Sequence, residues 1–262
     1  MAVKVVGLDK DLEQKFWDHV RKDPLNYYFF IFDRTLHNKD TEILMAMEGE
    51  RIEGMMLVFK KSVIQIRGNR ITVDTLLNHL NLDMVELSSP RDCRDLVQKR
   101  YRAPREYEIV LMHLEKGNEN VLKKHETVRL PENSAEEVAE LLRESNPEWW
   151  GDTKVEDIRK SFDSSYWLGI LSEGKVVSVG VTRFVDFGCN IGIVATHKDF
   201  RKRGCATSIV SALVEEIFRR GDRALIHVLS DNASAIRAYE KVGFLPFQTY
   251  YQIKGGQRIT GG

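Results

Sequence analysis

IGIVATHKDFRKRGCATSIVSALVEEIFRRG, residues 191–221, predicts a strand, a basic turn and a long helix in that order. Residues 191–196 are mostly apolar and suit a strand. From Cys205 onward apolar residues recur at helical spacing, and Gly221 is placed to end the helix. The apolar stripe consists of positions 209, 210, 213, 214, 217 and 218. The turn between Arg201 and Ala206 therefore lies at a helix N-terminus.

This turn has the chemistry of an anion site. The first amide N–H groups of a helix lack internal partners, and the helix dipole favours negative charge there. Gly204 and the small Ala206 let a phosphate approach the backbone, and Thr207 adds a hydroxyl donor. Positive charge comes from three neighbouring side chains, Arg201, Lys202 and Arg203. We expect a phosphate here; the alternative is a solvated basic turn that begins a surface helix.

A second segment, ALIHVLSDNASAIRAYEKVGF at 224–244, predicts another strand and helix. Ser230, Asp231 and Asn232 are candidate N-caps, and Gly243 is placed to end the helix. The two segments thus repeat one pattern, in which a strand runs into a capped helix.

Together the two segments resemble the GCN5-related N-acetyltransferases (GNAT). The family's pyrophosphate loop reads Arg or Gln, two variable residues, Gly, one variable residue, then Gly or Ala, and it matches Arg201, Gly204 and Ala206. The family's second motif has Asn, Ala three residues later, Tyr four after that and a closing Gly-Phe. It matches Asn232, Ala235, Tyr239, Gly243 and Phe244. The resemblance covers about residues 126–254.

The resemblance implies an α/β (α+β) fold with a mixed, mostly antiparallel sheet flanked by helices. It implies that acetyl-CoA donates an acetyl group to a primary amine, which attacks directly in a ternary complex without a metal. The implied donor-binding residues are Ile193, Val194, Ala195, Thr196, Arg201, Lys202, Arg203, Gly204, Cys205, Ala206, Thr207, Asn232, Ala235 and Tyr239. Tyr239 would also be the catalytic acid that protonates the departing thiolate; the alternative for this residue is core packing.

The acceptor end of the site is less defined by the sequence. An alkyl amine is mostly protonated at neutral pH, so its attack needs a base. The strand CNIGIVA, 189–195, holds no carboxylate, which leaves Glu173, Asp186, His197 and His227 as candidates. The acceptor is a small molecule or a peptide amine. A non-catalytic acyl-CoA sensor is the alternative function.

The first part of the chain faintly repeats the second. Runs at 42–48, 52–59 and 62–67 predict strands, and 72–80 predicts a helix. Glu48-Gly49 and Glu173-Gly174 both separate two strands, but the first part lacks the phosphate loop. We predict two tandem units: 1–124, a degenerate GNAT-like or accessory domain, and 125–262, the catalytic domain. An unrelated fold for the first part is the alternative.

The composition of the chain bears on its partners, its location and the state of its cysteines. The 262 residues carry 39 Lys plus Arg and 39 Asp plus Glu, so no overall positive field favours nucleic acid. No apolar run reaches the length of a signal or membrane segment, and a cytoplasmic location is expected. Cys93, Cys189 and Cys205 are widely spaced, which favours reduced thiols over a disulfide or metal site.

Overall fold

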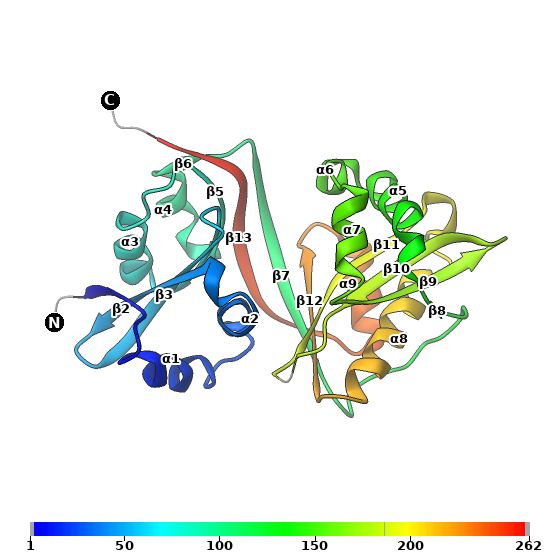
Figure 1. Ribbon diagram of the computed structural model, residues 1–262, viewed down its shortest axis with the longest axis horizontal. Coiled ribbons are helices and arrows are strands. Elements are labelled where there is room, and N and C mark those ends of the chain that lie inside the picture. Colours follow the sequence, from blue (N-terminus) through cyan, green and yellow to red (C-terminus); the bar gives the residue numbers. More distant parts are fainter. Residues whose placement is uncertain (1–2, 186, 260–262) are drawn as a thin grey trace. The chain divides into compact units, whose positions relative to one another are not determined.

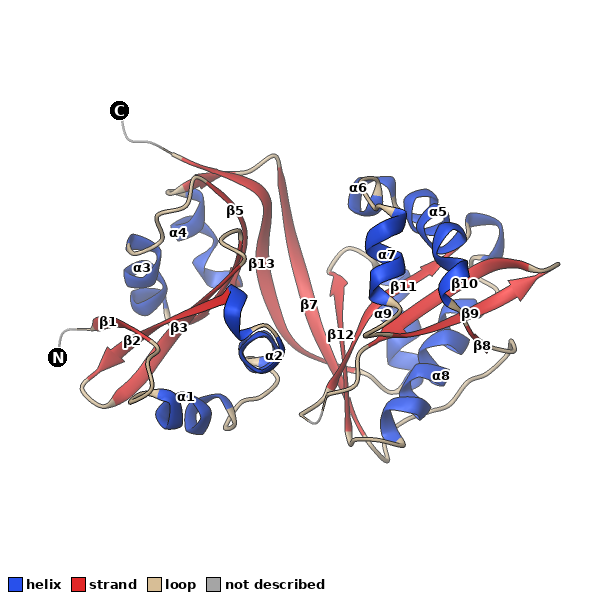
Figure 2. Cartoon of the chain, in the orientation of Figure 1, coloured by secondary structure: helices blue, strands red, loops and turns tan. Residues whose placement is uncertain are grey.

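The computed structural model describes residues 3–185 and 187–259. The thirteen strands of this part of the chain are mixed in direction, mostly antiparallel and flanked by helices (Figures 1 and 2). The predicted fold class is confirmed. None of the helices in the described part has the length and apolar character needed to span a bilayer.

The chain forms two compact units that are not consecutive halves of the sequence. Unit 1 comprises the chain up to Val110, Leu229–Asp231 and the chain from Gln248 on, and unit 2 holds the rest. Strands β7 (Arg105–Glu115) and β13 (Leu245–Arg258) therefore have residues in both units. The boundaries of these compact units differ from the predicted boundary at residue 124. The roles predicted for residues 1–124 and 125–262 stay a prediction.

Unit 1 has the strand order β1-β2-β3-β4-β5-β13. Its elements are β1 Lys4–Gly7, α1 Glu13–Val20, α2 Tyr28–Leu36, β2 Thr41–Glu48, β3 Arg51–Phe59, β4 Val63–Gly68, α3 Arg70–Asn78, β5 Met84–Pro90, α4 Arg94–Gln98 and β6 Tyr101–Arg102. The three strands predicted at 42–67 are confirmed. Before helix α1 the Asp9 carboxylate accepts the N–H groups of Asp11 and Leu12 and holds a turn.

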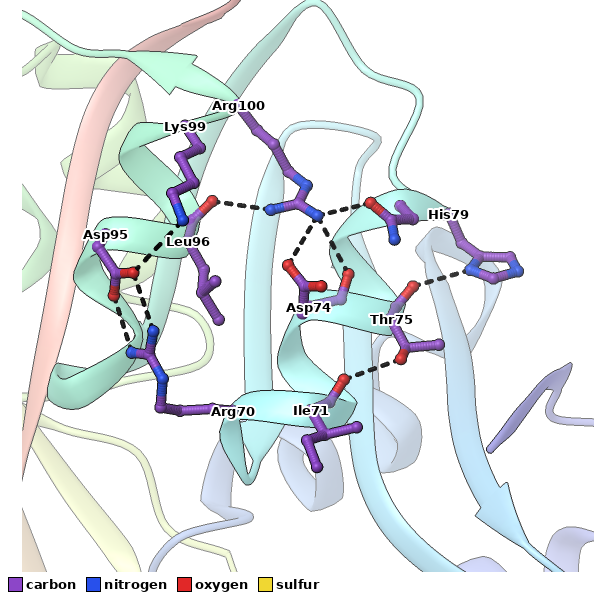
Figure 3. A network of polar contacts seen from close by, with 10 residues as sticks. Arg70, Ile71, Asp74, Thr75, His79, Asp95, Leu96, Lys99 and Arg100 are labelled. Atoms are coloured by element: carbon purple, nitrogen blue, oxygen red, sulfur yellow. Dashed lines mark hydrogen bonds and ion pairs between the residues drawn. The ribbon is translucent and has the colours of Figure 1, made fainter. Parts of the chain in front are cut away.

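The core of unit 1 lies between its sheet and helices α3 and α4. Ile64, Ile66 and Leu87 of the sheet pack with Leu76 of α3 and Val97 of α4, and all five are buried. Polar contacts join the same two helices, including the ion pair between Arg70 and Asp95 shown in Figure 3.

Unit 2 has the strand order β7-β12-β11-β10-β9-β8. Its remaining elements are β8 Val128–Arg129, α5 Ala135–Ser145, α6 Pro147–Trp150, α7 Val155–Ser161, β9 Tyr166–Ser172, β10 Lys175–Thr182, β11 Cys189–Thr196, α8 Cys205–Phe218, β12 Arg223–Leu229 and α9 Ala233–Val242. Helix α8 ends at Phe218, so Gly221 is not its cap as predicted. The Gly221 N–H instead bonds to the Ile217 carbonyl at 2.8 Å.

Helices cover the sheet of unit 2 on both faces (Figure 1). On one face, Val138 of α5 and Ile158 of α7 pack with Val179 and Ala195. On the other face α8 approaches so closely that a Cβ on Gly180 would lie 2.3 Å from Ile209 Cγ2. Every apolar position predicted for the stripe of α8 is buried, namely Ile209, Val210, Leu213, Val214, Ile217 and Phe218.

The connecting segment, residues 116–127 between β7 and β8, is mostly polar and charged. The structure places it within unit 2, along α9 and α8. The Asn120 N–H donates to the Val242 carbonyl at 2.8 Å, which satisfies the end of α9. Gly243 follows with a φ of 110°, and a Cβ there would lie 2.4 Å from the Asn118 carbonyl oxygen.

The contact between Gly243 and the connecting segment predicts a specific cost of substitution. Gly243→Ala adds both a left-handed strain and a clash, and should lower the free energy of unfolding by about 3 kcal/mol or more. Gly174→Ala is the control, because Gly174 has a φ of 79° and open space around it; it should cost about 1 kcal/mol. Urea denaturation measures both, and equal costs would contradict the close approach.

Candidate active site

Strands β11 and β12, which are neighbours in the middle of the sheet of unit 2, separate after a short paired stretch. They pair in parallel at three positions only, the last joining Ile191 to Ile226. Gly192 is an extra residue in β11, because Val181 of β10 pairs with Ile193 and Thr182 with Ile191. Such a bulge bends a strand and raises its local twist.

Beyond the bulge β11 has a partner on one side only. Residues 193–196 pair with Ser178–Val181 of β10, and no ladder to β12 continues among the described residues. Residues 193–196 are among the donor-binding residues that the family resemblance implies. The open edge has the geometry that an added extended chain requires.

The turn after β11 leads directly to α8. Lys202 and Gly204 have positive φ values of 60° and 95°, and Gly204 is the N-cap of the helix without any side-chain cap. The first intrahelical bond joins the Ser208 N–H to the Gly204 carbonyl at 2.9 Å. The N–H groups of the three residues before Ser208 find no acceptor among the described residues; they belong to Cys205, Ala206 and Thr207.

Arg201 bonds to the protein itself. Its Nε donates to the Thr196 carbonyl at 3.2 Å, and an Nη donates to the Ser145 carbonyl at 2.8 Å. The side chain therefore ties the turn to the end of β11 and to the end of α5. Lys202 and Arg203 are exposed on the same turn.

Helix α9 holds the second predicted motif. The Asn232 Oδ1 accepts the Ala235 N–H at 3.1 Å, so these two residues form the N-terminal cap as predicted for Asn232. Gly243 ends the helix in the left-handed conformation, also as predicted. Helix α9 packs against α8, the helix that carries the open N-terminus.

Tyr239 lies on α9 and is only 6% exposed. Burial raises the pKa of its phenol, with no charged group nearby to oppose the shift. No hydrogen bond to its hydroxyl is found within residues 3–185 and 187–259. The phenol is thus protonated at neutral pH and can donate a proton.

The four candidate bases lie in different places. The His227 Nδ1 is 3.0 Å from the Asn190 Oδ1, and His227 is the residue next to Ile226, where β12 leaves β11. His197 instead accepts the Asp199 N–H at 3.3 Å and caps a short turn before the phosphate loop. Glu173 lies exposed in the tight turn between β9 and β10. Asp186 is outside the described residues.

A family model described as Acetyltransferase (GNAT) family matches residues 135–244, the range that holds β11, the phosphate loop, α8 and α9. This stretch is a GNAT acetyltransferase domain. The family is one of acyltransferases, and membership implies an acyl-CoA donor. No group of three or more metal-ligating side chains occurs in the described part of the chain.

Similar proteins extend this result. The [ribosomal protein bS18]-alanine N-acetyltransferase of Escherichia coli K12 is 28% identical over 76 residues, which are 29% of this chain and 51% of that enzyme. The chain thus spans about half the length of this curated relative. A Drosophila protein structure covers 95% of this chain and 98% of its own with a TM-score of 0.70 at 13% identity. A tandem GNAT protein from the clavulanic acid biosynthesis pathway covers 85% and 84% with a TM-score of 0.51 at 12% identity.

Sequence reasoning missed one part of the surroundings of the GNAT domain. The connecting segment runs to the N-terminus of α8, where the Ser208 Oγ accepts the N–H groups of Lys124 and His125 at 3.0 and 3.2 Å. The His125 ring lies 2.9 Å from the Arg203 carbonyl, and the Ser211 Oγ accepts the Leu122 N–H at 3.0 Å. Two fully buried serines on an otherwise apolar helix face were the available signal.

The helix equivalent by order in unit 1, α3, begins with a side-chain cap. The Asn69 side chain accepts the Thr72 N–H at 3.0 Å. Arg70 in its first turn forms two hydrogen bonds to Asp95 and lowers the pKa of that carboxyl to about 2 (Figure 3). One first-turn N–H group of α3 and the arginine beside it thus have partners within unit 1.

The fully buried Ser208 predicts a local effect on the connecting segment. Ser208→Ala removes the acceptor of two backbone N–H groups and should lower the free energy of unfolding by about 1–3 kcal/mol. Hydrogen exchange at the Lys124 and His125 amides should accelerate. Ser211→Ala is the control and should affect the Leu122 amide instead. Unchanged exchange at 124 and 125 in the first variant would contradict the docked segment.

Proposed function

We propose that the GNAT domain binds acetyl-CoA at the N-terminus of α8 and transfers its acetyl group to a primary amine. One observation carries the proposal. Within the described ranges the Cys205, Ala206 and Thr207 N–H groups find no acceptor in another residue, Gly204 offers no side-chain cap, and the turn adjoins the open edge of β11. An anion on an extended arm satisfies both features together.

The residues present fit this donor. The turn carries Lys202 and Arg203 exposed to solvent, and Gly204 lets a pyrophosphate reach the backbone. The open edge of β11 at 193–196 offers backbone groups to the amides of a pantetheine arm. When bound, the donor supplies a thioester carbon that an amine can attack.

Cys205 lies at the start of α8 but is not proposed as a nucleophile. Burial raises the pKa of its thiol, and this outweighs the opposite influence of the residue's own nearby backbone N–H and of the charges on Arg203 and Lys124. The group therefore stays a thiol at neutral pH, and the thiolate is the reactive form. This supports direct attack of the amine without a covalent enzyme intermediate.

Tyr239 is proposed as the general acid. Its phenol stays neutral because burial raises its pKa. A neutral hydroxyl without a protein partner is available to protonate a departing thiolate. Backbone N–H groups on the open edge of β11 are proposed to stabilise the negative charge that develops on the carbonyl oxygen.

His227 is proposed as the base among the four candidates. Its position beside the last β11–β12 pair places it where the two strands separate, and Asn190 orients its ring through Nδ1. His197 has another task, since it caps the turn before the phosphate loop and lies 3.5 Å from a Glu144 oxygen.

The acceptor is proposed to be a peptide or small-molecule primary amine. The E. coli relative is named for acetylating an alanine of a ribosomal protein, which makes peptides with a free N-terminal amine the first acceptors to test. The rival function is a non-catalytic acyl-CoA sensor. A sensor would be stabilised thermally by acetyl-CoA but would release no free thiol with any amine.

Unit 1 is proposed as a degenerate or accessory domain that binds no acyl-CoA. Its β4 and β5 also pair in parallel at three positions only, ending at Gln65 and Ser88. Arg67 lies two residues further on; it is buried and its guanidinium stacks 3.9 Å from the centre of the Tyr250 ring. The Asn69 side chain caps the N-terminus of α3 and occupies the Thr72 N–H, a donor that a phosphate would need.

The phosphate site predicts the effect of charge reversal in the turn. Gly204→Glu puts a side chain and a negative charge where a pyrophosphate is proposed, and should weaken acetyl-CoA binding by about a hundredfold or more. Gly174→Glu makes the same change in the turn between β9 and β10 and should leave binding unchanged. Calorimetric titration measures both, and tight binding by Gly204→Glu would refute the site.

Removing the acid predicts a loss of rate and not of donor binding. Tyr239→Phe should lower kcat by about 10²- to 10⁴-fold while the affinity for acetyl-CoA stays within a few-fold. Because the raised pKa of Tyr239 keeps its phenol protonated, the residue should contribute no loss of activity up to pH 10.0. Tyr166→Phe on β9 is the control. Full activity in Tyr239→Phe would assign Tyr239 to packing alone.

The two histidines give opposite predictions. His227→Gln should lower kcat/KM by about a hundredfold at neutral pH, with a smaller loss at high pH where the amine is already neutral. His197→Gln should have little effect on the rate. Initial rates across pH with both variants decide between them, and the reverse order would make His197 the base.

A further inference from the structure

The connecting segment reaches the N-terminus of α8 through specific bonds. Lys124 and His125 share the buried Ser208 Oγ as acceptor, and the His125 ring contacts the Arg203 carbonyl. The matched family range begins at residue 135, so this segment precedes it. A part of the chain outside the GNAT domain thus lies beside the proposed phosphate loop.

Lys124 is held against Gly204. A Cβ placed on Gly204 would lie 3.4 Å from the Lys124 Cδ and 3.7 Å from its Cβ. The stem of the side chain therefore runs along the N-cap residue of α8. Throughout the described ranges, Lys124 has no carboxylate partner.

The neighbouring Lys123 differs in this respect. Its ammonium forms an ion pair with Glu215 on α8, so its charge is already compensated. Two adjacent lysines of one segment thus have different roles in the fold. The charge of Lys123 is already paired with Glu215, whereas Lys124 adds a cation near the helix N-terminus.

The electrostatics at this place are unfavourable without an anion. A helix N-terminus carries a partial positive charge and favours anions over cations. Here Lys124 and Arg203 lie close enough to lower the pKa of the Cys205 thiol, opposing the effect of its burial. The folded chain brings cations to a positive helix end, and a bound anion would relieve the repulsion.

We propose that Lys124 binds a phosphate of the acyl-CoA donor, so that the connecting segment completes the donor site. This inference rests on the proposed function, since it takes the donor to bind at the N-terminus of α8. It assigns the segment a part in recognition that its polar, linker-like composition does not suggest.

The test is calorimetric titration of the full-length protein with CoA and with pantetheine, which lacks the phosphates. Lys124→Met keeps most of the aliphatic stem against Gly204 and removes the charge. It should weaken CoA binding about tenfold or more, as expected for a charged hydrogen bond, and leave pantetheine binding unchanged. Lys123→Met is the matched control and should bind CoA as the natural protein does. Added salt should weaken CoA binding less in Lys124→Met.

The outcomes separate this inference from the proposed function. If the natural protein binds CoA and Lys124→Met binds it equally well, Lys124 has no part in the site while the proposed function stands. An equal loss of pantetheine binding in Lys124→Met would also overturn the inference, because it would indicate a disturbed fold. If the natural protein does not bind CoA, both fail together. Titration with 3′-dephospho-CoA tells which phosphate Lys124 contacts, and either result supports the inference.

Discussion

The proposed donor site depends on three backbone N–H groups that find no acceptor in another described residue, those of Cys205, Ala206 and Thr207. Buried or half-buried amides of this kind are normally satisfied by a capping side chain. Gly204 withholds that cap, and its φ of 95° suits glycine. The buried apolar stripe of α8 keeps the helix end in place, since the helix cannot move without exposing its core face.

The two units share an order of strands and helices but differ at the N-terminus of the helix that follows the first parallel strand. In both, two parallel strands pair at three positions and a helix follows the first strand. Asn69 caps the helix in unit 1, and Asp95 neutralises the arginine of its first turn. At the N-terminus of α8 the side-chain cap is absent, and Lys124 has no carboxylate partner in the described part of the chain. The capping side chain and the internal ion pair, and not the order of elements, distinguish the two helix ends.

Much of the fold could be predicted from local sequence signals. The apolar stripe of α8, the cap at Asn232 and the glycine at Gly243 each act through neighbours a few residues away, and local patterns report them well. The position of the connecting segment could not be predicted, because it depends on Ser208, more than eighty residues from Lys124. Arg201 stays a predicted phosphate ligand. Its bonds to the Thr196 and Ser145 carbonyls could not be predicted, because only the folded backbone brings these groups within its reach.

An amide NMR titration of the full-length protein with CoA tests the proposed donor site at the N-terminus of α8 most directly. We expect the Cys205, Ala206 and Thr207 amide resonances to shift most, because these N–H groups gain phosphate acceptors. The Thr72 amide in unit 1 should not move, since its N–H already bonds to the Asn69 side chain. Binding that shifts amide resonances of unit 1 and leaves those of residues 205–207 unchanged would contradict a donor site at the N-terminus of α8.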